Sequence, residues 1–171
     1  AAQYYEERGS VKADPRQPTA NLWFVRDGFL TAVAVPTEIH GPVMAMRSCQ
    51  EALKLAPDRP EAIALWLAAD IRREARLGMN VESGDPDPNA ARDPSAPQDF
   101  PRSICFSRTA GPLYCHRVLE RAVADRDAAV ALRVEAQASF VFADNAVGAL
   151  GGQVQRLPNH RFLLNVAGVG L

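Results

Sequence analysis

Cysteine and histidine are the residue types in this chain best suited to nucleophilic chemistry, and each occurs three times. Cys115 and His116 are adjacent, and an imidazole beside a thiol can activate the sulfur as a nucleophile. Neighbours on a helix point about 100° apart, so these two side chains would not face each other. Cys115 also fits the apolar stripe of its segment. We therefore expect a buried apolar thiol, and a small hydrolase or thiol-dependent enzyme subunit using Cys115 or acidic loop residues is the alternative.

Metal binding has little support in the sequence. No Cys-x-x-Cys occurs, and a structural zinc site requires four ligands at short spacing. Asp85, Asp87 and Asn89 repeat the first ligands of an EF-hand calcium loop, with prolines between them. Ala90 stands where that loop requires glycine, and Ala96 where it requires a bidentate glutamate. The run is predicted to be a solvated acidic linker, and no metal or cofactor is expected.

Three arginines near the end of a predicted helix over residues 61–77 are candidates for contact with a partner. Arg72, Arg73 and Arg76 could bind phosphate or an acidic peptide. Acidic residues interleave with them, and the C-terminal end of a helix favours cations in any case. The sequence therefore favours a solvated helix end, with partner contact as the functional alternative.

The two tryptophans are the other candidates for ligand or partner contact. Trp66 lies in the same predicted helix, and Trp23 lies in an earlier apolar run. A single tryptophan in an apolar run more often belongs to the core, so both are predicted to pack there, and Trp66 is kept as a candidate partner contact. No phosphate-binding loop, dinucleotide-binding motif or serine-nucleophile motif occurs, and no catalytic residue is assigned.

Composition describes an ordinary globular chain. The 171 residues are 47% hydrophobic and carry a formal net charge of −1, which excludes a disordered chain and argues against a nucleic-acid binder. No run reaches the eighteen or so apolar residues that a membrane-spanning helix requires. No signal peptide is visible, which favours the cytoplasm, although an upstream segment could have preceded Ala1.

The elements that must position these residues are one β-hairpin and several helices. Two aromatic and β-branched runs, 21–25 and 29–35, flank Asp27 and Gly28, which is a strong hairpin signal. Helical hairpins are predicted over 43–77 and 112–143, and the 29 alanines concentrate there. The predicted division is an N-terminal segment with the β-hairpin (1–40), a helical hairpin (41–79), a Pro- and Asp-rich linker (80–106) and further helical repeats (107–171).

Parts of both helical hairpins resemble known repeats. Ala45, Ala52 and Pro57 stand at the offsets of the second half of a tetratricopeptide repeat, with Cys49 in place of its aromatic residue. Residues 118–133 are similar to a HEAT-repeat turn, in which one helix ends at Asp-x-Asp and the next packs back.

The resemblance extends over about residues 21–134, and it is to mostly uncharacterised bacterial proteins that join such helix pairs to HEAT repeats. It implies a mainly α fold, a fragment of a longer α-solenoid, with one N-terminal β-hairpin. The function implied is a non-enzymatic protein-interaction scaffold without catalytic residues. Its partner would be another protein or the rest of a longer chain, and an uncapped apolar repeat face could drive self-association.

Overall fold

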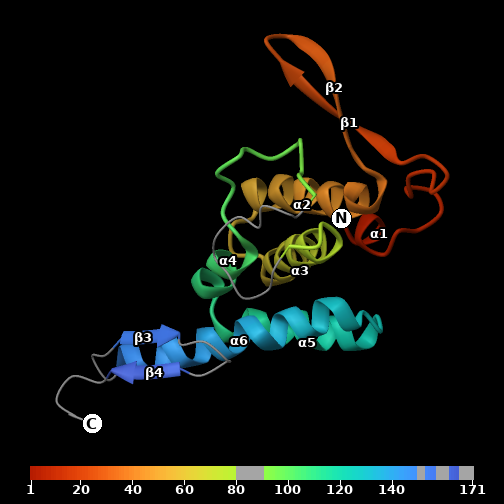
Figure 1. The fold of residues 1–171 in the computed structure, drawn as a ribbon. Helices are drawn as coiled ribbons and strands as arrows, with labels where there is room; N and C mark the ends of the chain where they lie inside the picture. The colour runs from red at the N-terminus through yellow and green to blue at the C-terminus, as the bar shows by residue number, and fades with distance from the viewer. Residues whose placement is uncertain (80–90, 150–152, 157–161, 166–171) are drawn as a thin grey trace.

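The computed structural model describes residues 1–79, 91–149, 153–156 and 162–165, which are mainly helical (Figure 1). The elements in chain order are α1 (Ala2–Tyr5), β1 (Thr19–Arg26), β2 (Phe29–Pro36), α2 (Thr37–Leu55), α3 (Pro60–Arg76), α4 (Ser103–Ala110), α5 (Pro112–Ala124), α6 (Ala128–Ala149), β3 (Gln153–Arg156) and β4 (Phe162–Asn165). The predicted helical class with an N-terminal hairpin is confirmed.

Strands β1 and β2 form the predicted antiparallel hairpin, which projects from the helical body (Figure 1). Asp27 and Gly28 have positive φ values of 51° and 80°, the type I′ geometry whose twist matches that of the strands. At the base of the hairpin, Leu22 and Val35 are buried in a small cluster with residues of α2. The hairpin therefore leans on α2 rather than standing alone.

Helix α2 begins at Thr37, four residues before the predicted start of the helical pair, and it runs through Pro42. Proline lacks the N–H that would bond to the carbonyl of Glu38 four residues earlier. Arg76 supplies a substitute, because its Nη1 donates to the Glu38 carbonyl at 2.6 Å. Gly41 is equally constrained, since a Cβ there would lie 2.9 Å from the Tyr4 carbonyl oxygen.

Helix α3 is the centre of the helical body, because it contacts α2, α4, α5 and α6. It begins with Pro60 in the first turn, where the missing N–H costs nothing. Ala45 of α2 and Ala68 and Ala69 of α3 are fully buried in the main core cluster. Small side chains at these positions allow the two helices to approach closely, as the alanine distribution predicted.

Part of the predicted linker is structured. Residues 91–102 lead into α4, which begins at Ser103 inside the predicted linker, and Asp93 and Arg102 are buried. Gly111, at φ 86°, separates α4 from α5. The predicted linker is therefore wrong at its C-terminal end, where α4 begins, whereas residues 91–102 form no helix or strand and are tied to α3 through Asp93 and Arg102.

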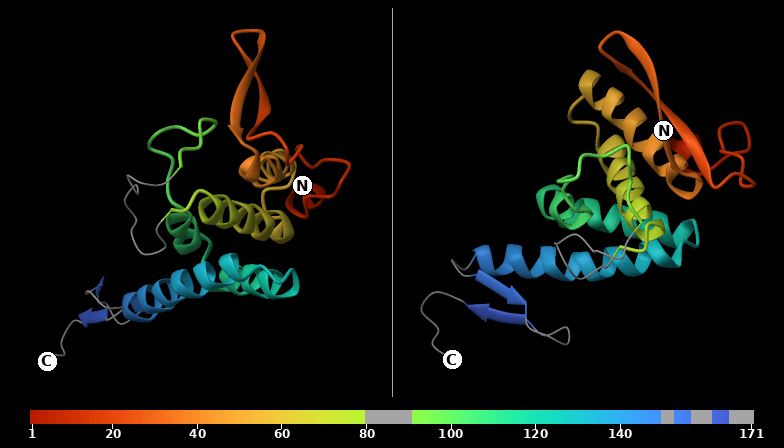
Figure 2. Two further views of the ribbon diagram at one scale, coloured as in Figure 1. Left: turned by 45° about the vertical axis from the view of Figure 1, so that its right-hand side comes forward. Right: turned by 45° about the horizontal axis from the view of Figure 1, so that its top comes forward.

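Helices α5 and α6 lie side by side and pack directly on α3, with α4 beside α3 (Figure 2). Asp127 caps α6, since its Oδ1 accepts the Val130 N–H at 3.1 Å. Cys115 is buried as predicted, and Val118 and Ala122 of the same helix are buried with it, whereas Val123 is exposed.

The C-terminal part differs from the predicted helical repeats. Helix α6 continues to Ala149, and β3 then pairs antiparallel with β4. Glycines follow α6, and residues 153–156 and 162–165 are paired as strands, so a helical repeat does not extend through this part. Among the residues that the structure describes, no helix is both long and apolar enough to cross a membrane.

Candidate functional site

The outward side of the N-terminal hairpin is an apolar surface without charge. Its cross-strand neighbours are Asn21 with Ala34, Trp23 with Ala32 and Val25 with Leu30, and we call these six residues the outer hairpin face. Trp23, Val25 and Leu30 remain 53%, 75% and 67% exposed. Strand alternation places them opposite the side chains that pack on α2.

The inner side of the hairpin is held against α2 by apolar packing and by one arginine. Phe24 is partly buried, and the Arg47 guanidinium lies 4.4 Å from its ring centroid. The Arg47 Nη2 also donates to the Trp23 carbonyl at 2.9 Å. Arg47 thus anchors β1 to α2 and leaves the outer hairpin face uncovered by the described residues.

The prediction that Trp23 belongs to the core is wrong. Trp23 lies on the exposed side of β1 and borders a pocket of about 440 Å³. Tyr4, His40 and Met44 line the same pocket. Burial lowers the pKa of His40, which disfavours its charged form. The charged side chains that line this pocket are Arg47 and Glu51 of α2.

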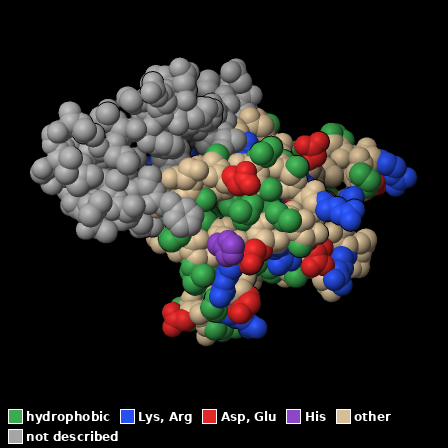
Figure 3. All heavy atoms as spheres, turned by 90° about the horizontal axis from the view of Figure 1, so that it is seen from below, with side chains coloured by type: hydrophobic (Ala, Val, Ile, Leu, Met, Phe, Trp, Pro, Cys, Tyr) green, Lys and Arg blue, Asp and Glu red, His purple; other side chains and the backbone are tan. Residues whose placement is uncertain are grey.

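Helices α5 and α6 form the opposite face of the molecule, which Figure 3 shows from below. Its exposed large apolar side chains are Leu113, Val123 and Leu132. In the visible part, hydrophobic side chains lie among acidic and basic ones. In its described part this face therefore carries more charge than the outer hairpin face, and self-association through an apolar repeat face stays a prediction.

The interpretation of a solvated arginine cluster at the end of α3 is wrong for Arg72 and Arg73, which are both buried. Arg72 lies over the ring of Tyr5, with 3.7 Å from its guanidinium carbon to the ring centroid. Its Nε is 2.8 Å from Asp127 Oδ2, and its Nη1 donates to the Tyr5 carbonyl at 2.6 Å. Arg72 thereby holds the N-terminal segment and the α5–α6 turn on α3.

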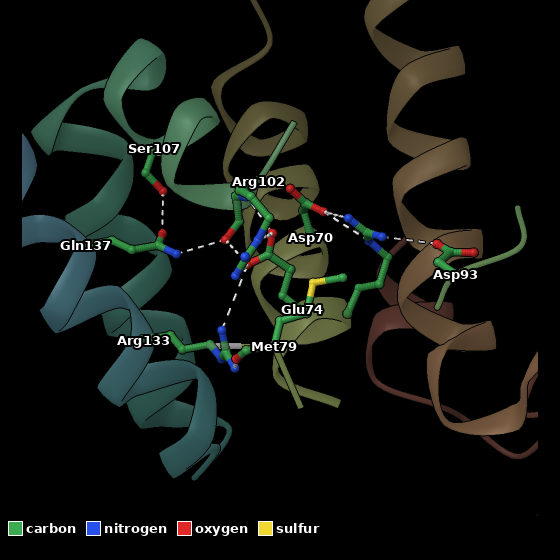
Figure 4. Close-up of polar contacts among 10 residues, drawn as sticks. Asp70, Glu74, Met79, Asp93, Arg102, Ser107, Arg133 and Gln137 are labelled. Atoms are coloured by element: carbon green, nitrogen blue, oxygen red, sulfur yellow. Dashed lines mark hydrogen bonds and ion pairs between the residues drawn. The ribbon is translucent and has the colours of Figure 1, made fainter. Parts of the chain in front are cut away.

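Arg73 binds two carboxylates that come from different parts of the chain. Its Nη2 donates to Asp70 Oδ1 at 2.8 Å, and its Nη1 donates to Asp93 Oδ2 at 3.1 Å (Figure 4). Burial raises the pKa of Asp70 to about 7, against the opposing effect of Arg73. Arg73 therefore fixes the segment around Asp93 to α3.

Arg76 is partly exposed and forms an ion pair with Glu7 in addition to its bond with the Glu38 carbonyl. It lines a pocket of about 620 Å³ together with Lys12, Pro18 and Glu38. All three candidate arginines thus have internal partners, and their contact with another protein stays a prediction.

Glu74 is the centre of a buried polar network that joins α3, α4 and α6 (Figure 4). Its Oε1 accepts from Arg102 Nε at 3.0 Å and from the Ser103 backbone N–H at 2.7 Å. The Ser103 hydroxyl donates to Glu74 Oε2 at 2.8 Å and accepts from Gln137 Nε2 at 2.8 Å. Arg133 lies 3.9 Å from the same carboxylate.

The oxygens of Glu74 and the polar groups of Ser103 and Gln137 have hydrogen-bond partners, as buried polar groups require, whereas Arg133 Nη1 has none among the described residues. The Ser107 hydroxyl completes it by donating to Gln137 Oε1 at 2.7 Å. Its charges are used for internal contacts, and the arrangement orders the three helices. No local sequence pattern predicts this network, because its hydrogen bonds join residues 28 to 34 positions apart in the chain.

Trp66 is a half-buried member of the core and not a surface anchor. Its ring meets that of Phe106 edge-on, with centroids 4.7 Å apart, and packs against the main cluster. The core prediction for Trp66 is confirmed, and its indole links α3 to α4.

The cysteines show no arrangement that would activate a thiol. Cys115 is buried as predicted, and burial raises the pKa of its thiol, which disfavours the thiolate. His116 points to solvent, 3.3 Å from Glu120 Oε1. Cys49 is also buried, and Cys105 is exposed. The described geometry thus offers nothing in favour of the thiol-enzyme alternative.

No group of three potential metal ligands occurs within the described ranges. The EF-hand-like run at Asp85, Asp87 and Asn89 lies outside them. Comparison with known proteins adds no assignment: no family model matches the chain, and neither do curated proteins or solved structures.

Proposed function

We propose that this chain is a non-enzymatic protein-interaction module whose helical body presents the N-terminal β-hairpin to a partner. The observation that carries the proposal is the outer hairpin face, where three large apolar side chains are mostly exposed and no charge interrupts them. Together they expose roughly 300–400 Å² of apolar surface, the size at which a patch on a monomer is often functional.

The helical body supports this role because it is built as a rigid base. Arg47 fixes β1 to α2, and Arg76 of α3 binds the Glu38 carbonyl of α2. The buried network of Glu74 joins α3, α4 and α6. A preorganised surface loses less conformational entropy on binding than a mobile one. A helical-repeat scaffold, as the sequence resemblance implies, would use its body in the same way, and membership in a longer solenoid is part of this proposal.

Site-specific photo-crosslinking tests the proposal. A photoreactive amino acid is placed at Leu30 on the outer hairpin face or, as the matched control, at Leu55, an exposed leucine at the end of α2. We expect protein crosslinks through position 30 and few through position 55 in cells that produce the chain. Equal yields at both positions, or none at position 30, would contradict the proposal.

A further inference from the structure

We infer that the outer edge of β2 pairs with β2 of a second copy of this chain, which produces a four-stranded antiparallel sheet around a two-fold axis. The inference rests on the proposed function, because it names the partner of the same hairpin. It follows from the outward backbone groups of β2 and from the uncharged residues of that strand.

Alternate residues of β2 direct their backbone groups away from β1. In a two-residue hairpin the pair beside the turn, here Arg26 and Phe29, is hydrogen-bonded. From there toward the base, hydrogen-bonded and non-hydrogen-bonded pairs alternate, and the residues of the non-hydrogen-bonded pairs direct their backbone groups outward. The Thr37 N–H donates to the Pro18 carbonyl at 3.1 Å, which fits the same alternation at the base. The N–H and C=O groups of Leu30, Ala32 and Ala34 therefore point outward, and no described residue binds them.

The outer edge of β1 is a poorer template than that of β2. The Trp23 carbonyl, in the middle of the β1 edge, already accepts from Arg47 of α2. That contact shows that the β1 edge faces the helical body. The β2 edge is consequently the side of the hairpin available to another strand.

Strand β2 also lacks the devices that normally prevent edge pairing. Its eight residues include no charged side chain, and its single proline is the last residue, Pro36. In natural proteins, a lysine, a central proline, a bulge or a short length usually keeps an edge strand from pairing with another chain. A two-stranded hairpin is itself marginal in water, and further strands stabilise it.

One register satisfies all the outward groups of both copies. With Ala32 of one copy opposite Ala32 of the other, each Leu30 faces the other copy's Ala34. Both partners are outward-directed residues, so every such pair exchanges two hydrogen bonds. The large leucine lies beside a small alanine on the outer hairpin face, which avoids a steric clash. A shift by two residues toward the base would bring Pro36, which has no N–H, into the ladder.

The paired edge supports a weak dimer. Pairing sets the two outer hairpin faces side by side and buries the outward backbone groups of residues 30–34 with the Leu30–Ala34 contacts, an area of at most about 1,000 Å², the lower limit for specific interfaces. The outer hairpin face and β2 are uncharged, so two copies meet without repulsion at the paired edge. A dissociation constant of about 1–100 μM is expected for an interface of this size.

Charge pairing at Ala32 tests the register on the full chain. Sedimentation equilibrium of the unmodified chain should show a reversible dimer. Ala32→Lys places two lysines opposite each other across the axis, and Ala32→Asp does the same with two aspartates. Each variant alone should dimerise at least about tenfold more weakly. An equimolar mixture should recover a heterodimer, detected by native mass spectrometry.

Asn21→Lys is the matched control, because it adds the same charge to the outer hairpin face but on β1, cross-strand from Ala34. It should change dimerisation less than Ala32→Lys, and circular dichroism should show equal helicity for all variants. The inference is overturned by a chain that is monomeric at 1 mM, a concentration about tenfold above the expected range. It is also overturned if the Ala32 variants dimerise normally or if their mixture shows no recovery.

The crosslinks at Leu30 separate this inference from the proposed function. Crosslinks only to a different protein would support an interaction module and overturn the second copy as its partner. Their complete absence at Leu30 would contradict the proposed function as well.

Discussion

Asp70 is the most unusual carboxylate of the described structure. It is fully buried, its Oδ1 accepts both hydrogen bonds from Arg73, and its Oδ2 has no partner among the described residues. Burial raises its pKa from 3.8 to about 7, so the folded chain keeps a proton that the unfolded chain releases. Between these two values, the folded state binds more protons, and stability must fall as pH rises.

We therefore expect the free energy of unfolding to decrease between pH 5 and pH 8 through Asp70. In the Asp70→Asn variant the side chain at this position cannot ionise, so the part of the pH dependence that comes from Asp70 should be absent. The free energy of unfolding of the variant should therefore improve, relative to that of the unmodified chain, as pH rises. Urea denaturation of both proteins at pH 5 and pH 8 measures the difference. An identical pH dependence in the two proteins would show that Asp70 is not responsible.

Glu74 neutralises two buried arginines, Arg102 and Arg133, and orients Ser103 at the start of α4. Glu74→Gln would leave these guanidinium groups without a buried anion, and we expect it to lower the free energy of unfolding by about 3–5 kcal/mol. Urea denaturation at pH 7 measures this loss.

Glu120→Gln is the matched control for Glu74, because Glu120 is exposed on α5 and pairs with His116 alone in the described structure. It should change stability by less than about 0.5 kcal/mol. Similar effects of the two substitutions would show that the Glu74 network contributes little to the folded state.

At the scale of elements, α2 depends on a contact from another helix. Pro42 leaves the Glu38 carbonyl without its helical donor, and Arg76 of α3 donates to that carbonyl. The interior proline and the arginine thus form one structural unit, even though they are 34 positions apart in the printed sequence.

A double-mutant cycle tests this unit. Arg76→Met should lower the free energy of unfolding by about 1 kcal/mol in the unmodified chain, since it removes a donor from the Glu38 carbonyl. Pro42→Ala restores the backbone N–H that can bond to the Glu38 carbonyl. In that background, Arg76→Met should therefore lower the free energy of unfolding by at least about 0.5 kcal/mol less than it does in the unmodified chain. Additive effects of the two substitutions, measured by urea denaturation, would disprove the coupling.

The elements themselves were largely predictable. Asp27 and Gly28 specify the hairpin turn, Pro60 begins α3 and Asp127 caps α6, and each of these signals acts on residues next to it in the chain. The start of α2 and the presence of α4 were missed. In both cases a side chain from α3, Arg76 or Glu74, stabilises the backbone of a distant segment.

For the whole molecule, α3 connects the N-terminal half to α4, α5 and α6. Arg72 of the same helix contacts both Tyr5 and Asp127, so one side chain binds the N-terminal segment and the α5–α6 turn to α3. These contacts should make the α2–α3 pair and the α5–α6 pair unfold together.

Native-state hydrogen exchange provides the test. Amides in the middle of α3 and in the middle of α5 should open with the same free energy and the same dependence on urea, because neither pair keeps its buried surface without the other. Substantially greater protection of α3 than of α5 would indicate two independent units and would contradict this expectation.

The sequence by itself determined the helical class, the hairpin, the burial of Cys115 and the absence of a recognisable catalytic motif. These features depend on periodicity, turn residues and caps, which act over a few neighbouring positions. Tertiary structure decided that Arg72, Arg73 and Glu74 are buried, because their partners include Tyr5, Asp93 and Arg102, between 20 and 67 residues away. It also decided that Trp23 faces outward. Strand alternation divides β1 into two faces, but only the position of α2 selects which face is covered.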